Sequence, residues 1–417
     1  MPSSFARLCV LVLALMSTSR AMAEDWPQWR GADRTDRSPE TGLLKEWPKD
    51  GPPQVWIYRD CGLGYSGVAV VGNQLFTMGA RDGKELLICV DVTKGEQLWA
   101  AEVGNVLANG WGDGPRSTPT VDGEFVYALG GEGDIVCAKC SDGSVAWRKK
   151  LQDFGGSVPN WGYTESVLVD GDRLVCTPGG DQGTMLALNK TNGEKIWQSA
   201  DIKDPAHYAS PIIAEHNGIR QYIQLTEKSV LGVNAETGAL VWRADWPGKV
   251  AVIPTPIFHE GSVYVTAGYG VGCNLFRIDE NNQAHAVYSE DNIKVMKNHH
   301  GGVILLDKHI FGHSDSVGWV CQDLATGEQK WRERSALGKG AVTYADGMLY
   351  CVAEEGGEVA LVEASTEGFS EKSRFTLTPQ TEKRNPKGRI WTHPVIANGK
   401  LYLRDQDLLF CFDVKQK

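Results

Sequence analysis

A ten-residue pattern that returns along the chain limits the possible folds more than any other feature. In Val90–Trp99, Asp91 is followed four residues later by Gly95 and, after four more, by Trp99. A side-chain oxygen before a turn can accept bonds from backbone N–H groups two residues on, and glycine supplies the positive φ that the turn needs. The pattern therefore predicts a strand, a tight turn and a second strand with its Trp on a buried face.

The pattern recurs at intervals of 43 to 50 residues. Degenerate copies run from Arg277 to Tyr288 and from Val362 to Phe375, so eight units can be counted. A period that regular is typical of a repeat protein. Structural needs recur in every unit whereas a single site does not, so we assign the repeated positions to packing and turns. They are Trp56, Trp99, Trp147, Trp197, Trp242, Trp331, Asp91, Asn189, Asn234 and Asp323.

Each unit has room for four strands. In the second unit, turn residues separate expected strands at 117–121, 125–129, 134–139 and 145–149. Residues 54–59 form one isolated strand, whereas the C-terminus has three, at 392–396, 400–403 and 408–413. The sequence predicts an all-β fold, an eight-bladed β-propeller of four-stranded antiparallel blades. We expect the N-terminal strand to complete the last blade, because closure removes open sheet edges.

The first residues are typical of an export signal. An apolar run, Leu8–Met16, is too short to span a bilayer, and Ala21–Ala23 supplies small residues for cleavage before Glu24. We expect a signal peptide at 1–23, a lead-in at 24–50 and the propeller at 51–417. The lead-in shows no helix or strand periodicity, and its Trp residues are expected to pack on the propeller. The mature protein should be periplasmic or extracellular, with no membrane span.

The net charge limits the classes of partner that the protein can bind, and the cysteine content bears on whether it has disulfides. Loss of Arg7 and Arg20 with the signal peptide changes the formal net charge from −10 to −12. An acidic exported protein is a poor candidate for binding nucleic acid. Nine cysteines remain, and their irregular spacing does not indicate a disulfide framework. Cys89, Cys137, Cys321 and Cys411 share one repeat position, which indicates small buried residues; Cys61 and Cys273 fall outside the pattern.

The repeat, written [AV]-x-[DN]-x-x-T-G-x-x-x-W, resembles that of the quinoprotein dehydrogenases, which are eight-bladed propellers. It also resembles that of the outer-membrane assembly scaffold lipoprotein, which carries no quinone. The start Trp26–Gly31 is similar to the Trp-Pro-x-[FW]-Arg-Gly start of exported pyrroloquinoline-quinone-repeat proteins of planctomycete type. The resemblance implies fold and location more than activity.

The resemblance to the dehydrogenases raises the question of their cofactor. They stack the quinone between a Trp and a disulfide of adjacent cysteines, beside Ca²⁺. This sequence has no adjacent cysteines, and Cys137–Cys140 is followed by Ser141 rather than by the His of a haem attachment motif. We therefore expect no cofactor; pyrroloquinoline quinone with calcium belongs to an alternative, a dehydrogenase of alcohols or sugars.

Function is expected where the blades differ, at the approach to each innermost strand. Aligned units place varied residues at one register around the channel: Tyr65, Arg116, Thr164, Tyr208, Ile253, His299, Lys339 and Trp391. The next register holds Ser66, Ser117, Glu165, Ala209, Pro254, His300, Gly340 and Thr392. Polar and aromatic side chains that converge on a channel mouth are typical of a ligand site. The set predicted to bind is Tyr65, Trp111, Arg116, Asn160, Trp161, Tyr163, Glu165, His207, Tyr208, His299, His300, Lys339, Trp391 and His393.

Several of these residues have a second interpretation. Trp111 and Trp161 lie beside Asn and Gly, a composition suited to sugars or other ring ligands, but they could instead fill gaps between blades. His299 and His300 would point to opposite faces of a strand and so would not chelate one metal together. Glu165 with Arg116 or Lys339 could be an acid–base set, but we expect a structural ion pair across the channel.

We expect an exported monomeric scaffold or binding protein of the cell envelope, without catalysis. Its binding face would be the channel mouth. Its partner would be an envelope protein or a small polar or ring ligand.

Overall fold

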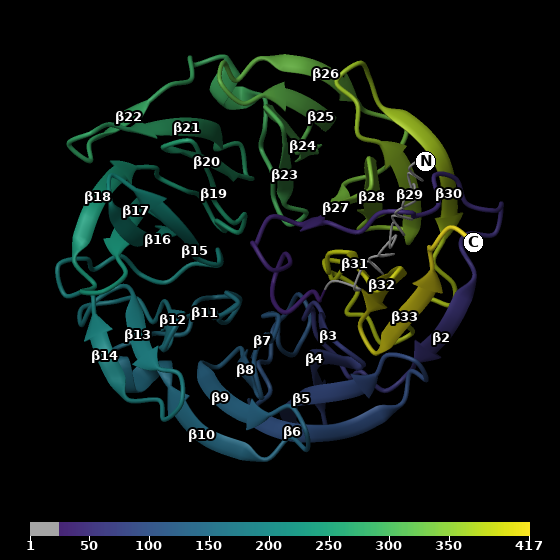
Figure 1. Cartoon of the computed structure of the whole chain (residues 1–417), viewed down its shortest axis with the longest axis horizontal. Coiled ribbons are helices and arrows are strands. Elements are labelled where there is room, and N and C mark those ends of the chain that lie inside the picture. Colours follow the sequence, from purple (N-terminus) through teal and green to yellow (C-terminus); the bar gives the residue numbers. More distant parts are fainter. Residues whose placement is uncertain (1–24) are drawn as a thin grey trace, which may run out of the picture.

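Eight sheets of antiparallel strands stand around a common centre in the computed structural model, which describes residues 25–417 (Figure 1). The predicted eight-bladed β-propeller is confirmed. The predicted signal peptide and its cleavage site lie outside the described residues. Between 25 and 417, helical structure is limited to the short 3₁₀ turns η1 (Leu151–Phe154) and η2 (Asn292–Lys294). No helix in that range is both long enough and apolar enough to cross a membrane.

Blades 1 to 4 follow one another along the chain. Blade 1 contains β3 (Ala69–Val71), β4 (Gln74–Arg81), β5 (Lys84–Asp91) and β6 (Gln97–Asn105). Blade 2 contains β7 (Thr120–Asp122), β8 (Phe125–Leu129), β9 (Asp134–Lys139) and β10 (Val145–Lys150). Blade 3 contains β11 (Leu168–Asp170), β12 (Arg173–Cys176), β13 (Leu186–Asn189) and β14 (Lys195–Gln198). Blade 4 contains β15 (Ile212–His216), β16 (Ile219–Leu225), β17 (Ser229–Asn234) and β18 (Leu240–Asp245).

Blades 5 to 8 complete the ring. Blade 5 contains β19 (Ile257–His259), β20 (Ser262–Ala267), β21 (Gly272–Ile278) and β22 (Ala284–Ala286). Blade 6 contains β23 (Val303–Leu306), β24 (His309–Ser314), β25 (Gly318–Asp323) and β26 (Gln329–Glu333). Blade 7 contains β27 (Gly340–Ala345), β28 (Met348–Ala353), β29 (Glu358–Glu363) and β30 (Ser370–Thr376). Blade 8 contains β31 (Val395–Ala397), β32 (Lys400–Asp405), β33 (Leu408–Asp413) and the N-terminal β2 (Gln54–Tyr58).

The last blade is assembled from both ends of the chain. β2 pairs antiparallel with β33, with Trp56 opposite Cys411. The lead-in also contributes a strand, which the sequence analysis did not expect: β1 (Arg37–Ser38) pairs parallel with β27 and makes blade 7 five-stranded. Two residues are too few to show a periodicity, so the pattern of the sequence carried no signal for β1.

The innermost strands begin later than predicted. The sequence indicated strands at 117–121 and 392–396, whereas β7 begins at Thr120 and β31 at Val395. Proline precedes each start, at Pro119 and Pro394, and proline has no N–H to donate to a ladder. The backbone ahead of these strands is therefore free of the ladder.

Five of the six repeat Trp residues bond the turn of the following blade. The indole nitrogen of Trp99 donates to the carbonyl oxygen of Cys140 at 2.9 Å. A Cβ on the turn residue Gly143, at φ 74°, would lie 2.5 Å from the Trp99 ring. The ring therefore lies on the turn, which requires glycine for its φ and for close approach. Trp56, Trp147, Trp197 and Trp331 donate in the same way to Val92, Lys190, Ala235 and Ser365, at 2.8 to 3.1 Å.

The degenerate units keep an aromatic ring at the Trp position but do not make the bond from an indole nitrogen to the next turn. In blade 5, Tyr288 replaces Trp, and its hydroxyl donates to the carbonyl of Leu324 at 2.5 Å. In blade 7, Phe375 has no donor and packs its ring 5.2 Å from that of Phe412. Trp242 donates to Oε1 of Gln221 in its own blade, since blade 5 has no Thr-Gly turn to receive it.

The recurring Asp and Asn residues cap the turns, as predicted. Oδ1 of Asp91 accepts from the backbone N–H groups of Thr93 and Lys94 at 2.8 and 2.9 Å. A further bond from the Thr93 hydroxyl is the main cause of a lowered pKa of Asp91, and the backbone bonds add to it. Asn189, Asn234 and Asp323 accept equivalent bonds in blades 3, 4 and 6.

The shared cysteine position lies directly opposite the repeat Trp. Cys89, Cys137, Cys321 and Cys411 pair across the outer strands with Trp99, Trp147, Trp331 and Trp56. A small side chain leaves space for the indole, and a Cβ on Gly232, the equivalent residue of blade 4, would lie 2.2 Å from the Trp242 ring. All nine cysteines from residue 25 onward are buried and unpaired. Cys61 lies near the buried Arg404, and Cys273 contacts Gln322, in places that the repeat did not predict.

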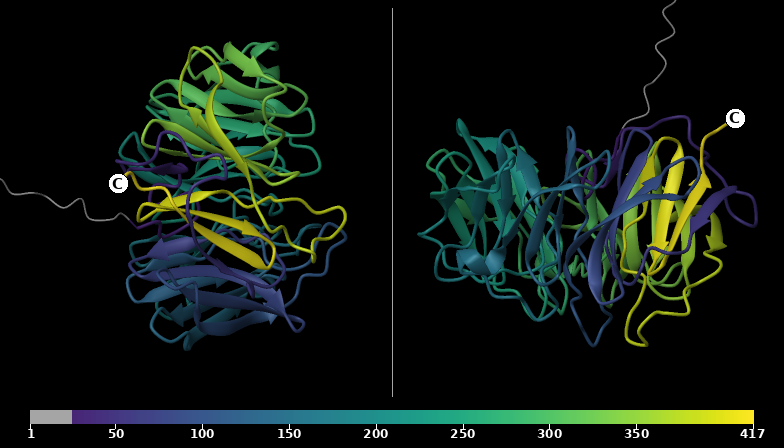
Figure 2. Two further views of the ribbon diagram at one scale, coloured as in Figure 1. Left: turned by 90° about the vertical axis from the view of Figure 1, so that its right-hand side faces the viewer. Right: turned by 90° about the horizontal axis from the view of Figure 1, so that it is seen from below.

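The lead-in closes one end of the central channel. Residues 26–38 run across the centre of the ring, on the face opposite the loop between β30 and β31 (Figures 1 and 2). From blade 1 to blade 8 the contacts are Trp26 with Val70, Pro27 with Val121, Arg34 with Val167 and with Pro211, Trp29 with Thr255, Arg30 with Val303, Asp36 with Tyr344, and Asp36 with His393. The segment therefore touches every blade or the loop that leads into it.

Two buried arginines hold this segment in place. Arg34 donates to the carbonyl oxygens of Ser166, Val167 and Pro211, which line the inner ends of blades 3 and 4. Burial lowers the pKa of Arg34 to about 9. Arg30 donates to the carbonyl of Val303 and forms an ion pair with Asp36 at 2.7 Å. Carbonyl groups that the short innermost strands leave unpaired are thereby satisfied.

Candidate functional site

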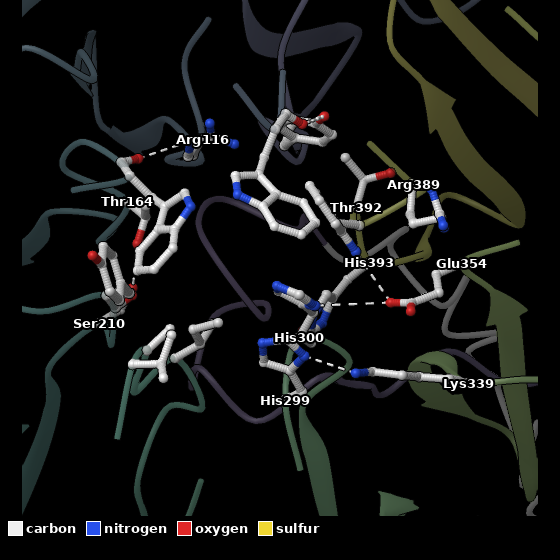
Figure 3. Close-up of a pocket in the computed structure, with 18 of the residues that line it drawn as sticks. Arg116, Thr164, Ser210, His299, His300, Lys339, Glu354, Arg389, Thr392 and His393 are labelled. Carbon is white, nitrogen blue, oxygen red and sulfur yellow. Dashed lines mark hydrogen bonds and ion pairs between the residues drawn. The ribbon is translucent and has the colours of Figure 1, made fainter. Parts of the chain in front are cut away.

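A cavity of about 490 Å³ occupies the centre of the ring (Figure 3). Trp29 of the lead-in contributes to its wall from the closed end. The long loop between β30 and β31 contributes Lys387, Arg389 and Trp391 from the opposite end. Figure 2 shows that loop projecting from the face opposite the lead-in. The cavity is therefore a pocket with a mouth on one face of the propeller.

One predicted register lines this cavity completely. All eight of its residues contribute, one from each blade: Tyr65, Arg116, Thr164, Tyr208, Ile253, His299, Lys339 and Trp391. Each precedes its innermost strand, where the backbone has left the ladder and the side chain turns to the axis. The next register mostly faces the blades instead, because Ser66, Ser117, Glu165 and Ala209 are buried there. His300 and Thr392 are exceptions and line the cavity.

The two Trp-containing loops take part in the mouth. Trp111 is 45% exposed and lines the cavity, so it does not fill a gap between blades. Its carbonyl accepts from the Tyr65 hydroxyl at 2.7 Å. Trp161 also lines the cavity, with its ring 5.7 Å from that of Tyr208. The loops thus bring aromatic faces beside the polar side chains of the predicted register.

Four of the predicted residues do not line the cavity. Tyr163 is buried in the core of blades 2 and 3, and its hydroxyl donates to the carbonyl of Pro178. Glu165 is buried and accepts a hydrogen bond from the backbone N–H of Thr177. His207 accepts from the N–H of Val252. The remaining one, Asn160, accepts through its carbonyl from the side chain of Asn109.

The expected arrangement of the two adjacent histidines is wrong. His299 and His300 lie ahead of β23 and not on a strand, so their rings do not point to opposite faces. The rings lie 3.6 Å apart at an angle of 36°, and both line the cavity. His300 also lies 4.8 Å from the ring of Trp391. The result is a stack of three flat rings along one wall.

Both histidines are held neutral. Nδ1 of His299 lies 2.7 Å from Nζ of Lys339. Burial, together with His300 and Lys339, lowers the pKa of His299 to about 2. Burial, with Lys339 and Arg116, puts the pKa of His300 well below its usual range. The 3.8 Å contact between His300 and Glu354 is therefore one of a neutral imidazole with a carboxylate.

Charged residues of the wall pair differently from the expectation. Nζ of Lys339 lies 2.9 Å from Oδ1 of Asp315, so the ion-pair partner of Lys339 is Asp315 and not Glu165. Arg116 donates to the carbonyls of Gly112 and Trp161, both at 2.8 Å. Glu165 lies instead near Arg34 of the lead-in. No ion pair crosses the channel between Glu165 and either cation among residues 25–417.

His393 joins the lead-in to the cavity wall. Its Nδ1 lies 3.0 Å from Oδ2 of Asp36, and its Nε2 lies 2.9 Å from the carbonyl of His300. Both ring nitrogens are therefore engaged. Within the described chain, no group of three or more His, Cys, Asp or Glu side chains is arranged to hold a metal ion.

Some wall residues were not predicted. Glu354 and Glu355 come from the turn between β28 and β29, and Lys387 and Arg389 from the loop between β30 and β31. Tyr269 comes from the turn between β20 and β21. The turns lie between the second and third strands of their blades, away from the predicted register ahead of the innermost strands. The 18-residue gap from Thr376 to Val395 was the available signal, because loops of that length are usually functional.

Comparison with known proteins identifies the family. A profile of the family described as outer membrane protein assembly factor BamB matches residues 83–333, more than half of the chain. The chain belongs to this family. BamB of Kangiella koreensis is 24% identical over 207 residues, which are 48% of this chain and 48% of that protein. Tetrathionate hydrolase of Acidianus ambivalens is 33% identical over 98 residues, 21% of this chain and 17% of that protein. The matches thus span half or less of these relatives.

Solved structures share the fold. BamB from Moraxella catarrhalis has a TM-score of 0.61 at 16% identity, over 87% of this chain and 98% of that one. Quinohemoprotein alcohol dehydrogenase from Comamonas testosteroni has a TM-score of 0.64 at 10% identity, over 94% of this chain and 81% of that one. Such likenesses establish the propeller, and function must be argued from the site.

Proposed function

We propose that this chain is an exported propeller of the cell envelope that binds a small ligand or a protein segment in the mouth of its channel. Its family is named for an outer membrane assembly factor, which supports an envelope location and a binding role. The export signal predicted at 1–23 supports the same location. The function proposed is binding without catalysis, by a monomer.

The lining of the cavity is the observation on which the proposal rests. The blades are built alike, yet each contributes a different side chain at the inner register. Packing would be served by similar residues in every blade. A closed end, a volume of about 490 Å³ and convergent aromatic and charged groups are properties of ligand sites.

The wall does not fit the quinone of the alternative function. Among residues 25–417 no cysteine lines the cavity, and the two carboxylates that line it are those of Glu354 and Glu355. Glu354 accepts from the indole of Trp391 at 3.1 Å, and Glu355 lies 2.6 Å from Arg389. The adjacent-cysteine disulfide and the acidic calcium ligands of the dehydrogenases thus have no equivalents here. We infer no oxidative step for this chain.

The proposal is tested by mouth variants of the full chain. Trp161→Ala and Trp391→Ala should abolish the quenching of intrinsic fluorescence by a ring ligand, or binding to a purified envelope protein. Their melting temperatures should stay near that of the wild type. Ile196→Ala is the matched control, because Ile196 is 43% exposed on the outer strand β14. Binding that survives both mouth variants would contradict the proposal, as would dye-linked alcohol oxidation after reconstitution with quinone and Ca²⁺.

A further inference from the structure

We infer that the cavity takes an acidic sugar, a pyranose ring that carries a carboxylate. This inference rests on the proposed binding function and names its ligand class. It follows from three features of the wall: a guanidinium without a carboxylate partner, a ring N–H without an acceptor, and carboxylates beside aromatic faces.

Arg116 is the first of these features. Its guanidinium lies over the ring of Tyr65, 4.9 Å from the centroid, and donates to two backbone carbonyls. Along residues 25–417 no carboxylate lies within ion-pair distance of it. Burial lowers the pKa of Arg116, and the more distant acids Glu85 and Asp113 oppose this effect only in part, so the charge keeps a desolvation cost. A ligand carboxylate would supply the missing charge, and arginine is suited to bind it through two N–H groups.

His299 supplies a donor. Lys339 carries only N–H donors, so Nδ1 of His299 must accept the bond between them, and the ring proton lies on Nε2. Nε2 is buried and has no hydrogen-bond partner. In Figure 3 this nitrogen lies on the side of the ring away from Lys339, toward the cavity. A buried donor without an acceptor is costly, and an oxygen of a bound ligand would offset that cost.

The balance of charge favours an anion. Within the described chain, four cations line the cavity, Arg116, Lys339, Lys387 and Arg389, against the two carboxylates Glu354 and Glu355. Asp315 pairs with Lys339 and Glu355 with Arg389, which leaves Arg116 and Lys387 without an acidic partner among residues 25–417. The ammonium of Lys387 lies 5.7 Å from the centroid of the Trp111 ring. Arg116 and Lys387 both lie beside the loop that carries Trp111 and Gly112. The anionic group of the ligand is therefore expected at that side.

The carboxylates of the wall argue for a sugar rather than an aromatic acid. Glu354 and Glu355 can only accept hydrogen bonds when ionised, and an aromatic acid has no hydroxyl to donate to them. A sugar acid has both hydroxyl donors and a carboxylate. Trp111, Trp161 and Trp391 also line the cavity and add flat faces, against which the C–H face of a pyranose can pack.

The test is calorimetric titration of the purified full chain with glucuronic acid, glucose and benzoate. Glucuronic acid should bind at least tenfold more tightly than glucose, and benzoate should bind no better than glucose. Lys387→Gln should weaken glucuronate binding severalfold and leave glucose unchanged, because the Lys387 side chain bonds no backbone group in the structure. Arg116→Gln should have the larger effect. Lys195→Gln, an exposed cation on β14, is the matched control and should change neither.

The outcomes separate the two proposals. Equal affinity for glucose and glucuronate, or tighter binding of benzoate, would overturn the inference and leave the ligand site intact. The inference also fails if Lys387→Gln and Arg116→Gln both leave glucuronate binding unchanged. If none of the three compounds binds, but a protein partner binds the wild type and not Trp161→Ala, the inference of an acidic sugar is wrong and the proposed binding function stands. Failure of all compounds and partners would overturn the proposed function as well.

Discussion

The carboxylate of Asp36 lies 3.0 Å from Nδ1 of His393, a contact between residues 357 positions apart. Asp36 belongs to the lead-in and His393 to the approach to β31. The same carboxylate lies 2.7 Å from Nε of Arg30. Because all three side chains are nearly inaccessible to solvent, the group fastens the closed end of the channel to the cavity wall.

Removal of this carboxylate should therefore be costly. Asp36→Ala leaves the buried Arg30 without its ion-pair partner, and breaking a buried pair from one side costs about 3–5 kcal/mol. The measurement is urea unfolding followed by circular dichroism. Asp33→Ala, an exposed residue of the same segment, should stay within about 0.5 kcal/mol. Similar stability of the two variants would show that the lead-in does not hold the ring together.

Each repeat Trp should contribute as much to the free energy of unfolding as a large core residue. Trp197→Ala removes a ring that is 7% exposed, its bond to Ala235, and the packing on Gly238. A loss of about 3–5 kcal/mol is typical of such a truncation. Ile196→Ala, one residue away on the exposed side of β14, should cost far less. A small loss in Trp197→Ala would mean that contacts between blades are made mainly elsewhere.

Most of the fold could be predicted because its signal is repeated. The spacing of Trp99 from the later repeat Trp residues defined the blades, and each copy supported the others. The short β1 had no such support. The path of residues 26–38 across the ring could not be predicted, because contacts such as Arg34 with Pro211 join positions 177 apart that share no periodicity. Only the three-dimensional closure of the ring brings them together.

The candidate site was predictable to the extent that it follows the blades. The register from Tyr65 to Trp391 lines the cavity because equivalent positions of a ring face the same axis. The additional residues Glu354 and Tyr269 come from turns between the second and third strands of their blades, whereas the predicted register lies ahead of the first strands. His299 and His300 show the limit of local rules: alternation holds on a strand, but these residues precede one.

The buried thiols should be unreactive until the chain unfolds. Burial raises the pKa of Cys89, Cys137 and Cys321 to about 12, so almost no thiolate forms at pH 8. Native protein should give little reaction with Ellman's reagent, and denatured mature protein should give nine thiols per chain. Fast reaction of several thiols without denaturant, or fewer than nine after it, would contradict the burial or the absence of disulfides.

Closure of the ring by β2 gives a prediction about truncation. Deletion of residues 54–59 removes the strand that pairs with β33, exposes that edge, and should cause loss of cooperative unfolding and aggregation. Deletion of Gln416 and Lys417 should be tolerated much better, because it removes one backbone bond, from Gln416 to Gly42. Light scattering and thermal unfolding of both truncations provide the measurement. Equal melting temperatures would show that blade 8 does not need its N-terminal strand.

The pH dependence of stability should carry the signature of Glu165. Burial raises its pKa to about 7, opposed by bonds from Thr177 and Gln224 and by the charge of Arg34. The folded state then holds the proton more tightly than the unfolded state, whose carboxyl titrates near 4.5. This contribution to stability is complete below pH 4.5 and is lost as pH rises through 7, by about 1–3 kcal/mol.

Glu165→Gln should remove that loss. Its free energy of unfolding relative to the wild type should therefore rise between pH 4.5 and 8, whereas Glu236→Gln, on an exposed turn, should show no such trend. A parallel pH profile for wild type and Glu165→Gln would show that Glu165 is ionised in the folded state throughout this range.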